Sequence, residues 1–156
     1  MMDKEVDVRD YIQKEFVNLN LISERKEDAI RELAQLVENV QEIADFEHFL
    51  EDVFERERLE TTGIGDEIAI PHARTDVVSR LIIAVGRSTH GVEFESLDGR
   101  KVKLIFLMGT PKGSVSHYLK ILAQLTRLLK REPFREKLLE AQDGEMVVKL
   151  FRGSED

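Results

Sequence analysis

The stretch Thr61-Thr-Gly-Ile-Gly-Asp-Glu-Ile-Ala-Ile-Pro-His-Ala-Arg74 joins a turn rich in threonine and glycine to a short apolar run that ends at proline. The run Ile68 to Ile70 predicts a strand. Pro71 predicts its end, because proline has no N–H to donate to a β-ladder. His72 follows directly, and an imidazole at a strand end, facing a loop of small hydrogen-bond donors, is a candidate nucleophile or general base. A solvated loop histidine is the simpler alternative, and this stretch alone does not separate the two.

Length and composition indicate one globular domain. We expect a single domain over residues 1–156, long enough to close a hydrophobic core. The chain has 23 basic and 31 acidic residues and a net charge of −8. This balance argues against a nucleic-acid partner, which would require a basic surface to neutralise phosphates. The absence of cysteine excludes disulfides, thiol catalysis and thiolate zinc sites.

The N-terminal segment gives no targeting or membrane signal. Residues 1–10 are charged and lack an apolar h-region, and no later apolar run approaches the length of a membrane span. We therefore expect a cytoplasmic protein without direct membrane insertion. Residues 1–14 carry charges and isolated valines without a clear period, which predicts a loosely ordered arm.

Hydrophobic spacing predicts the first elements. Alternating apolar residues favour a strand from Phe16 to Ile22. Helical spacing then favours a helix from Ser23, its expected cap, to about Asn39. Asp45 is the expected cap of a second helix, whose apolar positions recur at i, i+3, i+4 and i+7 from Phe46 onward.

The second half of the chain predicts strands followed by helices. Leu81 to Val85 and Val102 to Met108 are nearly continuous apolar runs, as in strands covered on both faces. An amphipathic helix is predicted from about Ser114 to Lys130, and two shorter helical segments come after it. The whole order predicts an α/β layered sandwich, with a small mixed β-sheet flanked by α-helices.

Two loops of small residues fail the nucleotide-binding patterns. Gly63-Ile-Gly65 lacks the third glycine of a dinucleotide fingerprint, because Ile68 stands there. Gly109 to Ser114 lacks the glycine-lysine-serine trio of a phosphate-binding P-loop. His72 and His117 have no third ligand at the spacing of a metal site, so we expect neither a metal nor a bound organic cofactor.

Two histidines and one arginine remain as candidates for phosphoryl chemistry. His117 falls in the first turn of the predicted 114–130 helix, where free N–H groups attract anions such as phosphate. Arg56 lies near the edge of the buried stripe of the second helix. A neutral imidazole can hold a phosphoryl group as a phosphoramidate, and Arg56 and protonated His117 can supply positive charge. The alternatives are an exposed polar residue for His117 and a solvated helix end for Arg56.

The run from Arg56 through Thr61-Thr-Gly-Ile-Gly to Ile68-Ala-Ile-Pro-His72 strongly resembles a known signature. It is that of the mannitol/fructose-type EIIA domains of the bacterial phosphoenolpyruvate-dependent sugar phosphotransferase system, which have nitrogen-type EIIA relatives. The resemblance extends over nearly the whole chain. It implies that His72 accepts a phosphoryl group from the phosphocarrier protein HPr and passes it to an EIIB partner. It further implies that His117 orients or stabilises the phosphoryl group and that Arg56 is the active-site arginine.

The sequence departs from the family pattern beside the signature. Asp66-Glu67 stand before the strand, where many members carry glycine or asparagine, and Ala73-Arg74 come after His72. We expect two acids so near the site to influence which carrier docks, because charge complementarity steers encounters. No EIIB or EIIC sequence follows, which implies a freestanding subunit.

Two functions stay open at this point. One is a phosphoryl carrier for sugar uptake. The other is a nitrogen-type regulatory protein, in which phosphorylation of His72 controls binding to target proteins without sugar transport.

Overall fold

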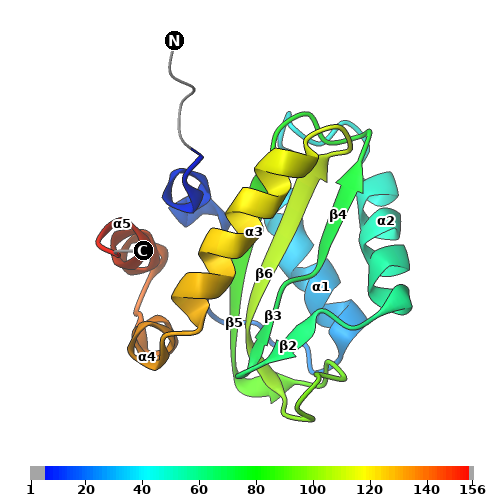
Figure 1. Ribbon diagram of the computed structural model, residues 1–156. Coiled ribbons are helices and arrows are strands. Elements are labelled where there is room, and N and C mark those ends of the chain that lie inside the picture. The colour runs from blue at the N-terminus through cyan, green and yellow to red at the C-terminus, as the bar shows by residue number, and fades with distance from the viewer. Residues whose placement is uncertain (1–5, 155–156) are drawn as a thin grey trace.

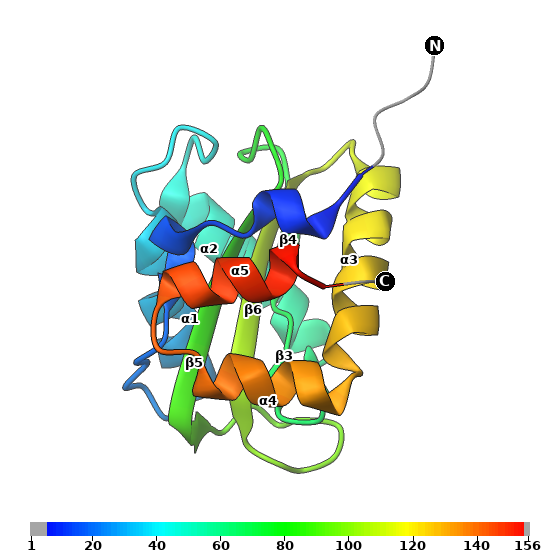
Figure 2. The same cartoon turned by 90° about the vertical axis from the view of Figure 1, so that its left-hand side faces the viewer.

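The structure, a computed structural model, describes residues 6–154 and confirms the predicted layered α/β sandwich (Figure 1). A mixed sheet of six strands lies between two layers of helices in this part of the chain. One face is covered by α1 (Lys26–Ala34) and α2 (Phe46–Leu59). The other face is covered by α3 (Val115–Leu129), α4 (Glu132–Glu140) and α5 (Gly144–Arg152), as Figure 2 shows.

The sheet is built around one long antiparallel pair. Its order is β1-β5-β6-β3-β2, and β4 also pairs with β6. Strand β1 runs parallel to β5, and β3 and β4 run parallel to β6. Strand β5 is antiparallel to β6, and β2 is antiparallel to β3. Their bounds are β1 (Val17–Asn18), β2 (Gly63–Gly65), β3 (Ile68–Ala69), β4 (His72–Thr75), β5 (Ile82–Val92) and β6 (Val102–Pro111).

Strands β3 and β4 are two parts of one line of chain beside β6. Ile68 pairs with Leu104 and His72 pairs with Met108, so the register is the same on both sides of the break. Pro71 lies in the break, and its carbonyl still accepts a hydrogen bond of 2.9 Å from the N–H of Met108. The predicted end of the strand is therefore an interruption, because proline removes a donor but keeps its acceptor and an extended backbone.

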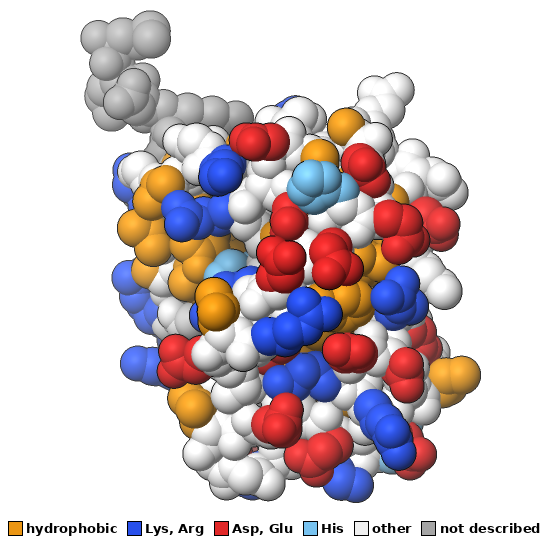
Figure 3. Space-filling view, turned by 90° about the vertical axis from the view of Figure 1, so that its right-hand side faces the viewer, with side chains coloured by type: hydrophobic (Ala, Val, Ile, Leu, Met, Phe, Trp, Pro, Cys, Tyr) orange, Lys and Arg blue, Asp and Glu red, His pale blue; other side chains and the backbone are white. Residues whose placement is uncertain are grey.

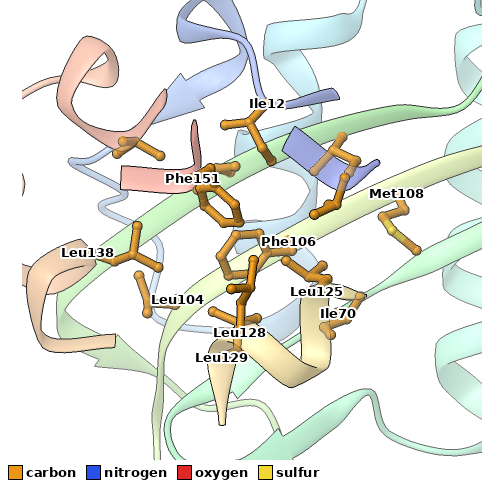
Figure 4. Packing of buried hydrophobic residues seen from close by; sticks show 14 of the residues in the cluster. Ile12, Ile70, Leu104, Phe106, Met108, Leu125, Leu128, Leu129, Leu138 and Phe151 are labelled. Atoms are coloured by element: carbon orange, nitrogen blue, oxygen red, sulfur yellow. The ribbon is translucent and has the colours of Figure 1, made fainter. Parts of the chain in front are cut away.

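The central strand β6 is buried on both faces. Successive side chains point to opposite sides of a strand, so Phe106 and Met108 pack under α3, while Ile105 and Leu107 pack under α1 and α2. Figure 4 shows the first of these clusters, in which Phe106 lies among side chains of α3 and α5. The continuous apolar run predicted for this strand reflects the two covered faces.

The predicted cap of the second helix, Asp45, is confirmed, whereas the predicted cap of the first helix, Ser23, is not. The Asp45 side chain accepts a hydrogen bond of 3.1 Å from the N–H of His48, as a cap does. Ser23 caps nothing, since α1 begins at Lys26. The Glu32 carboxylate instead accepts from the N–H of Ser23 at 3.0 Å and holds the preceding chain extended.

The prediction of a loosely ordered arm over residues 1–14 is wrong for residues 6–14, while residues 1–5 lie outside the described part of the chain. Val8 and Ile12 are 1% and 2% exposed. The N–H of Val8 donates to Gln124 Oε1 of α3 at 2.7 Å, and Ile12 points toward the same core as Phe151 (Figure 4). Val8 begins a short 3₁₀ turn and Ile12 follows it. Two buried residues are too few to produce a sequence period, which is why hydrophobic spacing did not predict their docking.

We expect Ile12→Ala to lower the free energy of unfolding by about 2 to 5 kcal/mol, because it leaves a cavity in the core. Denaturant unfolding monitored by circular dichroism measures this change. Gln13→Ala, at the exposed neighbour, is the matched control and is expected to stay within about 0.5 kcal/mol of the unaltered chain. Equal stabilities for the two variants would show that the segment is not docked.

Candidate functional site

A pocket of about 830 Å³ opens between α2, β4 and the start of α3. It takes side chains from both helical layers, because β4 lies beside β6 at a border of the sheet. His72, the first residue of β4, lines this pocket together with Arg56 of α2 and Tyr118 of α3. The structure thus brings two of the three predicted site residues into one pocket.

The His72 ring is held by its own backbone. Its Nδ1 lies 2.9 Å from the carbonyl oxygen of Ile70, two residues earlier. A carbonyl oxygen only accepts hydrogen bonds, so Nδ1 must carry the hydrogen. In the neutral ring, Nε2 then carries the lone pair.

Tyr118 lies directly against that atom. Its hydroxyl oxygen is 2.9 Å from His72 Nε2, and the centroids of the two rings are 5.3 Å apart. Because Nε2 has a lone pair and no hydrogen, the tyrosine hydroxyl donates. Tyr118 was not among the predicted site residues, since an aromatic residue on the apolar side of an amphipathic helix is typical of the core.

Burial lowers the pKa of His72. The carbonyl of Ile70 opposes this effect, and the positive charges of Arg56 and Arg74 reinforce it. The charge of Glu57 raises the same pKa in part. The net result is a ring that stays neutral, with no hydrogen on Nε2, at a pH where an unperturbed histidine is partly protonated.

Arginines provide the positive charge around the pocket. Arg56 donates from Nη1 to the carbonyl oxygen of Glu60 at 2.8 Å, which fixes its side chain at the C-terminal end of α2. Arg74 lies with its guanidinium carbon 5.9 Å from the centroid of the Tyr118 ring. Arg56 was predicted, whereas Arg74 was noted only as a departure from the family pattern.

His117 does not reach this pocket. Its Nε2 lies 2.9 Å from the hydroxyl oxygen of Tyr11, and its ring lines a separate pocket of about 180 Å³ that also contains Arg80. Consecutive residues on a helix point about 100° apart, so Tyr118 faces His72 while His117 faces the N-terminal segment. The structure therefore does not bring His117 and His72 into one pocket.

The Thr/Gly loop also does not face His72. Thr62 Oγ1 donates to Glu57 Oε1 at 2.6 Å, and Thr61 Oγ1 donates to the carbonyl oxygen of Phe94 at 2.9 Å. Glu57 is 6% exposed and is ion-paired with Lys26 Nζ at 3.0 Å. The Glu57 bond ties the loop to the end of α2, and the Phe94 bond ties it to the segment after β5. Glu57 itself is the sequence signal for this arrangement, because a carboxylate on the buried stripe of a helix needs a polar partner.

The acidic pair Asp66-Glu67 lies away from the pocket. The two residues form the turn between β2 and β3, with φ angles of 57° and 67°, as a tight hairpin turn requires. Glu67 is ion-paired with Arg100 and Lys103. The expectation that these acids lie near the site is therefore wrong, because the length of β3 separates them from His72.

Residues 6–154 offer neither a metal site nor a membrane span. No cluster of three His, Asp or Glu side chains in this range has the geometry of a metal site. None of the helices in the same range combines the length and the hydrophobicity that a transmembrane span requires.

The sequence matches a known family and its curated relatives. Residues 10–153 match the profile described as phosphoenolpyruvate-dependent sugar phosphotransferase system, EIIA 2. The fructose-specific EIIA component of Haloferax volcanii is 38% identical over 133 residues, which cover 85% of this chain and 86% of that protein. A nitrogen regulatory protein of Bradyrhizobium diazoefficiens is 32% identical over 147 residues, with 92% and 94% coverage. The fructose-specific EIIABC component of Bacillus subtilis is 36% identical over 144 residues, covering 92% of this chain and 23% of that longer protein.

Solved structures show the same fold. The nitrogen regulatory protein IIA-Ntr of Neisseria meningitidis superposes with a TM-score of 0.86 at 26% identity, covering 92% of this chain and 98% of that chain. Enzyme IIAMTL in complex with phosphorylated enzyme IIBMTL, from Escherichia coli, gives a TM-score of 0.79 at 21% identity, with 91% and 97% coverage. At that identity the second likeness concerns the fold alone.

We expect the His72 ring to titrate below the ordinary value of 6.5 and to remain in the Nδ1–H form at neutral pH. Two-dimensional ¹⁵N NMR of the ring nitrogens measures both properties. Because the folded state binds this proton less tightly than the unfolded chain, His72 should reduce stability as the pH falls below about 6.5. A ring that titrates above that value, or that carries its hydrogen on Nε2, would contradict the assigned geometry.

Proposed function

The chain belongs to the EIIA type-2 family of the phosphoenolpyruvate-dependent sugar phosphotransferase system, and from this membership we propose that it is a phosphoryl carrier. In this proposal, His72 accepts a phosphoryl group from HPr and passes it to an EIIB partner for sugar uptake of the fructose or mannitol type. The observation that carries the proposal is the neutral His72 ring, whose Nε2 lone pair borders an open pocket.

The transfer is a nucleophilic displacement at phosphorus. The lone pair of His72 Nε2 attacks the phosphorus of the phosphohistidine on HPr, and the new N–P bond forms as the donor's N–P bond breaks. The electron pair of the broken bond returns to the donor nitrogen. Nδ1 keeps its hydrogen throughout, because the carbonyl of Ile70 accepts it. Onward transfer repeats the displacement, with His72 as the leaving group.

Positive charge lowers the barrier by stabilising the phosphoryl oxygens. Arg56 uses Nη1 for its bond to Glu60, which leaves its other N–H groups for these oxygens. Arg74, two residues after His72, lines the same pocket. Catalysis of phosphoryl transfer consists mostly of positioning and electrostatic stabilisation, and this pocket offers both.

The rim of the pocket suits a protein partner. Three of its lining residues expose large apolar side chains, namely Leu59 at 83%, Val115 at 42% and Leu119 at 53%. On the face shown in Figure 3, hydrophobic side chains gather beside basic ones at the left. Apolar surface next to a reactive group is typical of a transient docking site, and we assign it to HPr and EIIB in turn. The complex of IIAMTL with phosphorylated IIBMTL supports an EIIB partner by analogy.

A nitrogen-type regulatory role is the second candidate. Its support is the 32% identity to a nitrogen regulatory protein and the fold shared with IIA-Ntr. Both functions use phosphorylation of His72 and differ in the later fate of the phosphoryl group. Transfer of this group to an EIIB protein of the same organism supports the carrier. A phosphorylated form that transfers to none of them, but binds target proteins differently from the unphosphorylated form, supports the regulator.

We expect the protein to gain one phosphoryl group when it is incubated with phosphoenolpyruvate, Enzyme I and HPr, and His72→Gln to gain none. Intact-mass spectrometry measures the gain, and acid lability identifies it as phosphohistidine. His117→Gln is the control and should be phosphorylated like the unaltered protein, because its ring lines the other pocket. No gain of mass under conditions that phosphorylate a known EIIA protein would reject the proposed function.

Arg56→Ala should slow phosphoryl transfer from HPr by about tenfold or more, because it removes a charge that stabilises the transferring group. Stopped reactions with labelled phospho-HPr measure the rate, and circular dichroism checks the fold. Arg127→Ala is the control, since Arg127 is exposed on α3 and does not line the pocket. Equal rates for the two variants would assign Arg56 a structural role.

A further inference from the structure

We propose that Tyr118 is a catalytic residue whose hydroxyl hydrogen binds His72 Nε2 before transfer and a phosphoryl oxygen after it. The inference rests on the proposed carrier function and deepens it. It gives the stabilising role that the sequence suggested for His117 to the neighbouring residue, which contacts the reacting atom.

The resting site holds the His72 ring at both of its nitrogens. The Tyr118 hydroxyl lies 2.9 Å from Nε2, the nitrogen that forms the new bond. The other ring nitrogen is already bonded to the Ile70 carbonyl at 2.9 Å. These two contacts fix the orientation of the imidazole and direct its lone pair toward Tyr118 and the pocket.

Phosphorylation of Nε2 removes the acceptor of the hydroxyl hydrogen. Once Nε2 is bonded to phosphorus, it has no lone pair in the ring plane to accept a hydrogen bond. Tyr118 must then find another acceptor, and its hydroxyl must also shift away from the Nε2 lone pair, because its oxygen lies 2.9 Å from Nε2 in the direction in which the phosphorus binds. The nearest new acceptors are the oxygens on the phosphorus itself. A hydrogen bond to such charged oxygens is about twice as strong as one between neutral groups.

The tyrosine ring is held in place by its surroundings. Tyr118 is 9% exposed and sits in the first turn of α3, with the Arg74 guanidinium 5.9 Å from its ring centroid. A cation near the face of an aromatic ring stabilises this arrangement. The phenol therefore stays beside His72 when its hydroxyl shifts from Nε2 to the phosphoryl group, while Arg56 and Arg74 contribute the charge.

A phenol stays a hydrogen-bond donor over a wider pH range than an imidazolium keeps its charge. Burial raises the pKa of Tyr118, against the opposing effect of Arg56 and Arg74, so the hydroxyl keeps its hydrogen at neutral and mildly alkaline pH. An imidazole donor would lose its charge near its ordinary pKa of about 6.5. The transfer rate should therefore fall only at low pH, where His72 itself becomes protonated, and should not fall between about pH 6.5 and 9.

The test compares Tyr118→Phe with Tyr11→Phe, which removes the same hydroxyl from the tyrosine that contacts His117. We expect Tyr118→Phe to slow transfer from phospho-HPr by about tenfold or more, and to shift the phosphoryl equilibrium toward HPr. Tyr11→Phe should match the unaltered protein in both measurements. In ¹⁵N NMR of the unphosphorylated form, the Nε2 signal of His72 should shift in Tyr118→Phe alone.

A second variant separates loss of the donor from loss of the fold, and it makes the transfer rate depend on pH in a new way. Tyr118→His restores a donor, so we expect partial recovery of the rate over Tyr118→Phe, with a new decline as the pH rises through the pKa of the introduced ring. The unaltered protein should show no such decline. If Tyr118→Phe transfers phosphate at the unaltered rate, or if the transfer rate of the unaltered protein declines as the pH rises through about 6.5, the role of Tyr118 is rejected.

These outcomes separate the inference from the proposed function. Phosphorylation of His72 together with an unaffected Tyr118→Phe variant rejects the inference alone. An unaltered protein that takes up no phosphoryl group rejects the proposed function itself.

Discussion

The site depends on one short hydrogen bond between His72 Nδ1 and the carbonyl of Ile70. That bond fixes which ring nitrogen carries hydrogen, and so decides which nitrogen is free for chemistry. The two residues flank Pro71, where the line of chain along β6 is interrupted while its register continues unchanged on both sides. Ile70 points its N–H to the carbonyl of Thr62, away from β6, and its own carbonyl accepts from the imidazole.

The layered architecture then assembles the rest of the pocket around that ring. Within the described chain, β4 has β6 as its one partner in the sheet, so its outer side is open to both helical layers. Helix α2 comes from one face with Arg56 near its C-terminal end, and α3 comes from the other face with Tyr118 in its first turn. Three segments far apart in the sequence thus meet at one border of the sheet. The buried pair of Lys26 and Glu57 anchors the end of α2, which positions Arg56 without contacting the pocket's reactive atom.

The electrostatics of the pocket result from this partial burial. His72 loses water on folding and gains cationic neighbours, and both effects favour its neutral form. Tyr118 is buried beside it and keeps its hydrogen for the related reason that burial disfavours the phenolate. A neutral imidazole and a neutral phenol, with arginines at the rim, suit the proposed phosphoryl transfer, because the imidazole need not first lose a proton.

The sequence by itself determined the fold class, the core strands and the cap at Asp45. It also predicted His72 and Arg56 as candidate site residues, and both line the same pocket. These predictions depend on local spacing and on short motifs, because hydrophobic periods and turn residues act over a few positions in the chain. Which residue of α3 contacts His72 depended instead on the rotation of α3 about its own axis over the sheet. Adjacent residues on a helix face different directions, so the sequence could not separate His117 from Tyr118, and only the packing of α3 against β4 and the N-terminal segment decided it. The docking of Val8 and Ile12 and the burial of Glu57 were decided in the same way, since each depends on partners that are distant in the chain.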